Sequence, residues 1–238
     1  FDFFPPEQAE FFTARDREAL TGGTMMDIPA EPIQTKDHGL RWLHTKKLPL
    51  YDQAGMPRYL LGISEDITDR KQREEAERLR LAKLETQQAV LHELAEDPAI
   101  HSGHPQQAFP VITEYAVSTF AVERAGIWLF GENQSALILQ DLFEATPKHH
   151  LQGTTLSTGE YPAYLHALET EPYSLAAHDA QTDPRTSELT PSYLTPLGIV
   201  AMLDAPIRRH GRVVGVLCLE HIGPARVWTT EEQTFAAS

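Results

Sequence analysis

The sequence predicts an α+β protein in which two compact parts are joined by a long polar helix. Residues 25–63 contain three β-type segments separated by hairpin turns. Residues 70–78 contain no Gly, Pro or β-branched residue and are almost entirely charged or polar. Residues 97–238 alternate amphipathic helices with apolar strands. A helix as polar as 70–78 buries little of itself, so we expect it to connect two bodies or to pair with a copy of itself.

The first predicted part spans residues 1–68. A helix is expected over 5–21, because Pro stands at its start and Gly22-Gly23 at its end. The strands expected after it are 25–35, 40–51 and 57–63. One helix and an antiparallel meander of three strands are too little to bury a core alone.

The predicted strand 57–63 stops at an acidic, hydroxyl-bearing turn and gives way directly to the polar helix. Asp66 or Thr68 is placed to accept N–H bonds from the first turn of that helix. The alternative is a bond from Asp66 to Arg41 or to the Trp42 indole. Either contact would tie the sheet to the helix.

The connecting helix is expected over residues 69–96, about 42 Å at 1.5 Å per residue. Leu81, Leu84, Leu91 and Ala95 keep a three-four spacing, whereas the same register upstream falls on charged residues. Only the second half therefore favours a coiled-coil seam. A parallel homodimer is our working hypothesis, and a helix that leans on the next domain is the alternative.

The second predicted part spans residues 97–238, after Asp97-Pro98 breaks the connecting helix. Thr229 and Glu232 form a capping box that opens a last helix. The other helices expected here are 105–120 and 161–169. The strands expected are 124–130, 136–145, 199–207 and 213–220, with a short apolar segment at 174–178.

Composition excludes several classes of function. The net charge of −14 argues against non-specific binding of nucleic acid. No run approaches the eighteen or so uncharged apolar residues of a membrane span. The single cysteine, Cys218, forbids an intrachain disulfide and fits a reducing cytoplasm.

The first part resembles the C-terminal half of a PAS sensor domain with its PAC motif. The residues that carry this resemblance are 1–4, Arg41-Trp42, 49–52, 60–63 and 66–68. It implies that two further strands lie upstream. It also implies that Asp66 and Thr68 couple the sheet to the exit helix.

The second part resembles a GAF domain, in which the last helix looks truncated. The carrying segments are 179–185, 202–207, 211–221 and 228–235. Together the two parts resemble the sensory region of bacterial histidine kinases or diguanylate cyclases. That implies an effector domain downstream in the same polypeptide.

No catalytic or metal-binding constellation stands out, and the pairs His101/His104 and His149/His150 are expected to be solvated loop histidines. Cys218 lies in an apolar strand without a second thiol, which favours an inert core residue over a redox nucleophile. Phytochrome-type GAF domains attach a bilin through a Cys in the helical part of the pocket, and none stands there. A covalent bilin is therefore not expected.

A GAF resemblance implies a pocket between the sheet and its helical cover, where a non-covalent small ligand could sit. The candidate pocket residues are Tyr161, Tyr164, Asp179, Asp183, Arg185 and Tyr193. Alternatively, Asp179 and Asp183 cap their loop and Arg185 pairs with one of them.

We therefore expect a non-catalytic sensory region that relays a conformational signal through the connecting helix. Two other classes stay open. One is a ligand-free dimerisation scaffold, and the second is a GAF-fold thiol redox enzyme built on Cys218.

Overall fold

The computed structural model of the chain describes residues 6–35 and 37–238. Its helices and antiparallel sheets confirm the α+β class. The chain packs as two units, an N-terminal unit of Phe1–Leu84 and a C-terminal unit of Glu85–Ser238. Residues 1–4, which contributed to the PAS resemblance, lie outside the described residues.

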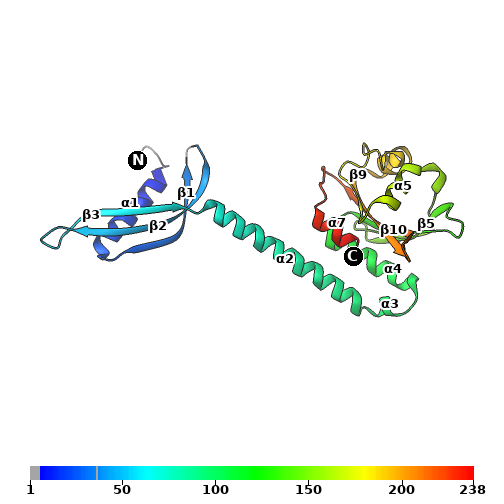
Figure 1. The fold of residues 1–238 in the computed structure, drawn as a ribbon, viewed down its shortest axis with the longest axis horizontal. Helices are drawn as coiled ribbons and strands as arrows, with labels where there is room; N and C mark the ends of the chain where they lie inside the picture. Colours follow the sequence, from blue (N-terminus) through cyan, green and yellow to red (C-terminus); the bar gives the residue numbers. More distant parts are fainter. Residues whose placement is uncertain (1–5, 36) are drawn as a thin grey trace. The chain divides into compact units, whose positions relative to one another are not determined.

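The N-terminal unit is a three-stranded sheet with one helix against it (Figure 1). The predicted helix and strands are all present, in the sheet order β1-β2-β3. Ala9 and Ala19 on the helix and Ile33 on the sheet are buried. The elements are α1 (Pro6–Gly22), β1 (Met26–Thr35), β2 (Gly39–Tyr51) and β3 (Pro57–Asp66).

Strand β3 runs past the acidic turn where the sequence predicts its end. Its backbone ladder continues through Ser64 and Glu65 to Asp66, which pairs with Leu43 of β2. The polar side chains do not stop the strand because they stay exposed while the backbone keeps its partners. The sheet therefore reaches almost to the first residue of the next helix.

Helix α2 (Thr68–Glu96) is a single unbroken helix, as predicted to within one residue. Leu81, Leu84 and Leu91 on it are 51%, 39% and 42% exposed. Within the C-terminal unit, the last turns of α2 and helix α4 line a shared apolar groove of about 140 Å³. Within the described residues, none of the helices combines the length and the apolar composition that a bilayer crossing needs.

The C-terminal unit is built on a seven-stranded antiparallel sheet of order β6-β5-β4-β10-β9-β8, with β7 also paired to β5. Its strands are β4 (Arg124–Phe130), β5 (Ala136–Glu144), β6 (His149–Leu151), β7 (Thr155–Ser157), β8 (Leu175–Ala177), β9 (Ile199–Arg209) and β10 (Arg212–Ile222). Its helices are α3 (Pro98–His101), α4 (Pro105–Phe120), α5 (Pro162–Thr170), α6 (Thr195–Leu197) and α7 (Thr230–Ala236). The predicted capping box of Thr229 and Glu232 opens α7.

Each face of this sheet buries its own apolar cluster. Helices α4 and α7 cover one face (Figure 1). The side chains of Phe120, Leu219 and Trp228 belong to the apolar cluster on that face. The other face, which we call the pocket face, is covered by α5 and by residues 187–197. Gly215 is required on β10, because a Cβ there would meet the Trp128 carbonyl oxygen at 2.3 Å.

The structure also corrects the sequence analysis at several short elements. Residues 187–197 form a 3₁₀ turn (Ser187–Leu189), a π-helix (Thr190–Leu194) and α6, where the sequence assigned no element. His149 and His150 are not loop residues, because they lie on β6, and His150 contacts the buried Asp141. Such short strands escape periodicity analysis, since three residues carry no pattern.

Candidate functional site

Thr68 joins sheet and helix at the start of α2. Its hydroxyl donates to Oδ1 of Asp66 at 2.5 Å and accepts the backbone N–H of Trp42 at 2.9 Å. Its own N–H donates to the same Asp66 oxygen at 2.9 Å. One buried hydroxyl thus links the end of β3, a residue near the start of β2 and the first residue of the helix.

A second backbone bond strengthens this strand–helix junction. The N–H of Ile67 donates to the carbonyl of Trp42 at 2.8 Å, and the Ile67 carbonyl accepts the helical N–H of Lys71. Ile67 and Thr68 are only 2% and 3% exposed. The first turn of α2 cannot leave β2 without breaking buried hydrogen bonds.

The electrostatics of the junction favour an ionised Asp66. The Thr68 hydroxyl and then the Thr68 N–H lower the pKa of Asp66, and the charge of Arg41 lowers it slightly more. Asp66 therefore satisfies the first-turn N–H, the first of the two predicted arrangements. Arg41 contributes only through its charge, and Trp42 through its backbone.

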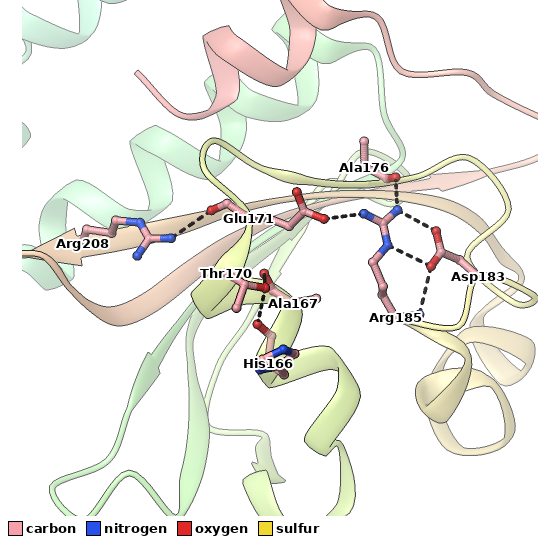
Figure 2. A network of polar contacts seen from close by, with 8 residues as sticks. All are labelled: His166, Ala167, Thr170, Glu171, Ala176, Asp183, Arg185 and Arg208. Atoms are coloured by element: carbon pink, nitrogen blue, oxygen red, sulfur yellow. Dashed lines mark hydrogen bonds and ion pairs between the residues drawn. The ribbon is translucent and has the colours of Figure 1, made fainter.

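Arg185 and Asp183 form a network at the surface of the C-terminal unit (Figure 2). The guanidinium donates to both Asp183 oxygens, to Glu171 at 2.7 Å and to the Ala176 carbonyl at 2.8 Å. This raises the pKa of Arg185 and lowers that of Asp183. Arg208 donates to the Glu171 carbonyl beside it (Figure 2). The N–H donors of Arg185 thus hold the loop in place. This agrees with the alternative in which Arg185 pairs with an acid of its own loop instead of binding a ligand.

Asp179 and Tyr161 have local partners too. Asp179 is exposed, and its backbone carbonyl accepts the N–H groups of Thr182 and Asp183. Tyr161 is buried, and its hydroxyl lies 3.1 Å from that of Ser192. Neither residue lines the cavity described next.

A small cavity lies on the pocket face, and we call it the sheet cavity. Its volume of about 10 Å³ is the room that one water molecule needs. Of the predicted pocket residues, Tyr164 and Tyr193 reach it. Leucine and valine side chains complete a wall that also includes Trp128, Met202, Cys218 and Glu220.

Both tyrosines of the sheet cavity donate to buried acids of the sheet. Tyr164 on α5 donates to Oδ2 of Asp204 on β9 at 2.6 Å. Tyr193 donates to Oε1 of Glu220 on β10 at 2.6 Å. Glu188 holds α5 in place, since its carboxylate accepts the first free N–H groups of that helix.

Glu220 and Asp204 differ in whether a cation compensates the negative charge of the carboxylate. Glu220 accepts the Arg124 guanidinium at 2.7 Å, and Arg124 also pairs with Glu144. Burial raises the pKa of Glu220 while Arg124 opposes that effect. Among the described residues, none of those that influence the pKa of Asp204 is a cation, and burial raises this pKa to about 7. Its Oδ1 has no hydrogen-bond partner among the described residues.

Cys218 lies beside these groups and is 4% exposed. Burial and the nearby carboxyls of Asp204 and Glu220 raise the pKa of its thiol well above the usual value. A nucleophilic thiol needs the opposite shift. The geometry therefore opposes the thiol redox enzyme.

Metal binding has no support in the parts of the chain that the structure describes. Within residues 6–35 and 37–238, no group of three or more His, Cys, Asp or Glu side chains is arranged to hold a metal ion. His150 instead bonds to Asp141 at 2.9 Å and to Glu114 at 3.2 Å. These carboxylates outweigh its desolvation and raise the pKa of His150.

Sequence reasoning missed Asp204 and Glu220 as buried acids of the pocket face, of which only Glu220 lines the sheet cavity. A signal was present, because each acid interrupts an apolar strand at a position that faces the pocket. Asp204 shares its face with Met202, and Glu220 shares its face with Val216 and Cys218. A lone charge on the inward parity of a core strand marks a buried acid.

Two family models match the chain. The model described as GAF domain matches residues 104–238, more than half of the sequence. The model described as PAS fold matches residues 1–72. The predicted order of PAS and then GAF is confirmed. No curated protein matches the chain in sequence.

Several solved structures share the fold. The chromophore-binding domain of the Stigmatella aurantiaca bacteriophytochrome has 14% identity and a TM-score of 0.52, over 99% of this chain and 78% of that one. A phycocyanobilin-bound GAF domain of a cyanobacterial phytochrome has 16% identity and a TM-score of 0.52, over 63% and 86%. The GAF domain of a phosphoenolpyruvate-protein phosphotransferase from Coxiella burnetii has 16% identity and a TM-score of 0.50, over 65% and 86%. At these identities the likeness shows the fold alone.

Proposed function

We propose that this chain, which belongs to the GAF domain family and carries a PAS fold ahead of the GAF domain, relays a conformational signal through helix α2. The two families place the chain in a sensory region of a signalling protein. The finer proposal is that this region catalyses nothing itself, resides in the cytoplasm and controls an effector, a histidine kinase or a diguanylate cyclase, in the same polypeptide.

The observation that carries the proposal is the strand–helix junction. A displacement of β2 or β3 acts directly on Thr68, because its hydroxyl bonds to both strands. Unbroken hydrogen bonding from Thr68 to Glu96 gives the displacement a stiff path along α2. Couplings of this kind are typically worth ~1–3 kcal/mol, comparable to one or two buried hydrogen bonds.

We further propose that α2 pairs with its copy in a parallel homodimer. Leu81, Leu84 and Leu91 lie exposed on it at coiled-coil spacing. Exposed leucines on an otherwise charged helix favour a partner helix. The alternative of a ligand-free dimerisation scaffold uses the same contact, and native mass spectrometry of the purified protein for a bound small molecule separates the two.

Any ligand of the GAF domain is proposed to be small and non-covalent. The sheet cavity has room for about one water molecule unless it opens. The thiol of Cys218 is buried in β10 with a raised pKa, which disfavours its attachment to a bilin.

The test is made on the full-length parent protein. Asp66→Ala and Thr68→Val remove the two sides of the junction, and we expect each to shift the basal effector output or its response to stimulus. Asp69→Ala is the matched control, since Asp69 is an exposed acid one residue into the same helix. Unchanged output in both junction variants would show that α2 is not driven from Thr68.

A further inference from the structure

A cleft of about 580 Å³, which we call the hairpin cleft, opens at one edge of the C-terminal sheet. Strand β4 ends at this edge, and its antiparallel neighbour β10 begins there. The turns beyond these strand ends line the cleft together with one side of helix α5. None of its lining residues lines the sheet cavity. Its volume lies in the range of about 300–1,000 Å³ that is usual for small-molecule sites, so room for a ligand is already present.

Arginines gather at the β9–β10 turn beside the hairpin cleft. Arg208, Arg209 and Arg212 are three of the seven Lys and Arg residues of 97–238. The same range holds sixteen Asp and Glu residues. Positive charge is therefore concentrated at this turn within an otherwise acidic region.

Arg209 and Arg212 lie opposite each other across the hairpin. They form a direct pair in the register of β9 and β10. The turn residues between them, His210 and Gly211, have φ angles of 51° and 78°. Two successive positive φ angles are typical of a type I′ turn, which matches the twist of the strands and holds them close. Because like charges directly opposite each other are unfavourable, an anion bound here would remove a repulsion.

Arg212 and Gln134 bring unused hydrogen-bond donors to the hairpin cleft. Both residues line the cleft and are exposed. Within the part of the chain that the structure describes, neither side chain has a hydrogen-bond or ion-pair partner. A guanidinium with free donors presents a planar fork that matches a carboxylate.

Arg208, which also lines the hairpin cleft, holds it together. Its Nη2 donates to the carbonyl of Glu171 at 3.0 Å and to two carbonyls at the end of α5 (Figure 2). This contact fixes the end of α5 against β9. The Nε and Nη1 groups of Arg208 make no hydrogen bond to a described residue, so its charge and two donors remain available.

The charge of the lining favours a ligand with one negative charge. Arg208 and Arg212 contribute two positive charges and Glu169 contributes one negative charge, which leaves one positive charge in excess. A carboxylate balances that excess. A phosphate monoester, with roughly two negative charges near neutral pH, would exceed it, and a cation would meet two arginines.

The remaining lining favours an apolar body on the carboxylate. Phe130, Pro162, Leu165 and Val213 contribute aromatic and aliphatic surface to the hairpin cleft. A bare carboxylate would leave this surface in contact with water, whereas an aromatic or aliphatic body would cover it.

We propose that the hairpin cleft binds a small carboxylate with an apolar body. The carboxylate lies at the fork of Arg212, with the amide of Gln134 as a further donor, and the body lies along Phe130 and Leu165. This inference names a ligand class for the GAF domain and in that respect rests on the proposed sensory function.

The experiment uses sodium phenylacetate as the probe and the full chain as the protein, with isothermal titration at pH 7.5. The compounds 2-phenylethanol and 2-phenylethylammonium chloride keep the carbon skeleton and change only the head group. Sodium acetate keeps the carboxylate without the ring, and phenyl phosphate places a dianion on the ring. We expect saturable binding of phenylacetate, and binding of each of the other four about tenfold weaker or more at the same ionic strength.

Arg212→Gln tests the fork that holds the carboxylate. We expect phenylacetate to bind about tenfold more weakly, since a charge-assisted hydrogen bond is lost. Lys148→Gln removes the same charge at an exposed residue of the C-terminal unit that does not line the cleft, and it should leave binding unaltered. Thermal melting of both variants checks that they fold.

Glu169→Gln tests the charge balance without removing an arginine. The variant loses the acid that opposes a bound anion, so we expect phenylacetate to bind about threefold more tightly. Glu231→Gln, at an exposed acid of α7, is the matched control. This variant keeps the proposal falsifiable if Arg212→Gln does not fold.

Three results would overturn the proposal. They are equal binding of any of the four comparison compounds, no saturable binding of phenylacetate to the wild type or to Glu169→Gln, and unaltered affinity in folded Arg212→Gln. The junction variants test signal relay through α2 in the parent protein, so the two ideas can fail separately.

Discussion

The strand–helix junction and the sheet cavity are both built on a carboxyl group that accepts a hydroxyl. At the junction Thr68 donates to Asp66, and beside the cavity Tyr164 donates to Asp204. The pKa of Asp66 is lowered, whereas burial raises that of Asp204 to about 7. The same bond thus accompanies opposite shifts, because Asp66 is exposed and Asp204 is fully buried.

This difference suits the two regions to different tasks. The junction satisfies its polar groups within the chain, so it holds two strands and a helix in one arrangement. Beside the sheet cavity, Oδ1 of Asp204 has no hydrogen-bond partner among the described residues, and burying such an oxygen without a donor is unfavourable.

The largest expected effect is at the ion pairs that Arg124 makes with Glu220 and Glu144 on the pocket face. Arg124→Met leaves Glu220 buried without its cation, and we expect the free energy of unfolding of the C-terminal unit to fall by ~3–5 kcal/mol. Urea denaturation followed by circular dichroism measures it. Arg212→Met, at an exposed arginine of β10, is the control. Equal losses in the two variants would mean that the buried acids are not compensated as described.

A pH series on Asp204→Asn sharpens the comparison next. The pKa of Asp204 rises from 3.8 to about 7 on folding, so the native state keeps a proton that the unfolded state releases between these values. Wild-type stability should therefore decline as pH rises from about 4 to about 7, relative to the variant. We expect Asp204→Asn to gain on the order of 1–4 kcal/mol over the wild type between pH 5 and pH 8.

Melting temperatures of both proteins at each pH measure this gain. The variant cannot ionise at residue 204, so the remaining pH dependence cancels in the difference. A difference that is flat from pH 5 to pH 8 would contradict a raised pKa. Glu169→Gln, which lies at the surface, should show no such trend.

A smaller effect is expected at the junction. Thr68→Val leaves the Trp42 N–H without its acceptor and should cost the N-terminal unit ~1–2 kcal/mol. Thr68→Ser keeps the hydroxyl and should recover most of that loss. Amide hydrogen exchange at Trp42 and Thr68 reports the contact directly. Exchange rates that are the same in Val and Ser variants would show that the hydroxyl does not hold the strand.

Local patterns in the sequence determined most elements of the fold. Proline and the glycine pair delimit α1, and the capping box of Thr229 and Glu232 opens α7. The charged, Gly-free stretch after Thr68 dictates α2. These features act within a few residues of one another, so a linear reading captures them. The same reading located Asp66 because the N–H that it accepts belongs to Thr68, the first residue of the adjacent helix. The bond of Thr68 to the N–H of Trp42 spans 26 positions and was not anticipated.

Tertiary structure alone decided which polar groups meet across the fold. Tyr164 and Asp204 are forty positions apart. Sequence spacing can anticipate few contacts over such a separation. Arg185 looked like a ligand-binding residue, yet folding brings Glu171 and the Ala176 carbonyl to it. Burial decides whether an acid is stabilised or lacks a hydrogen-bond partner. It depends on how the helices cover the sheet. It is a property of the packed chain and not of any segment of it.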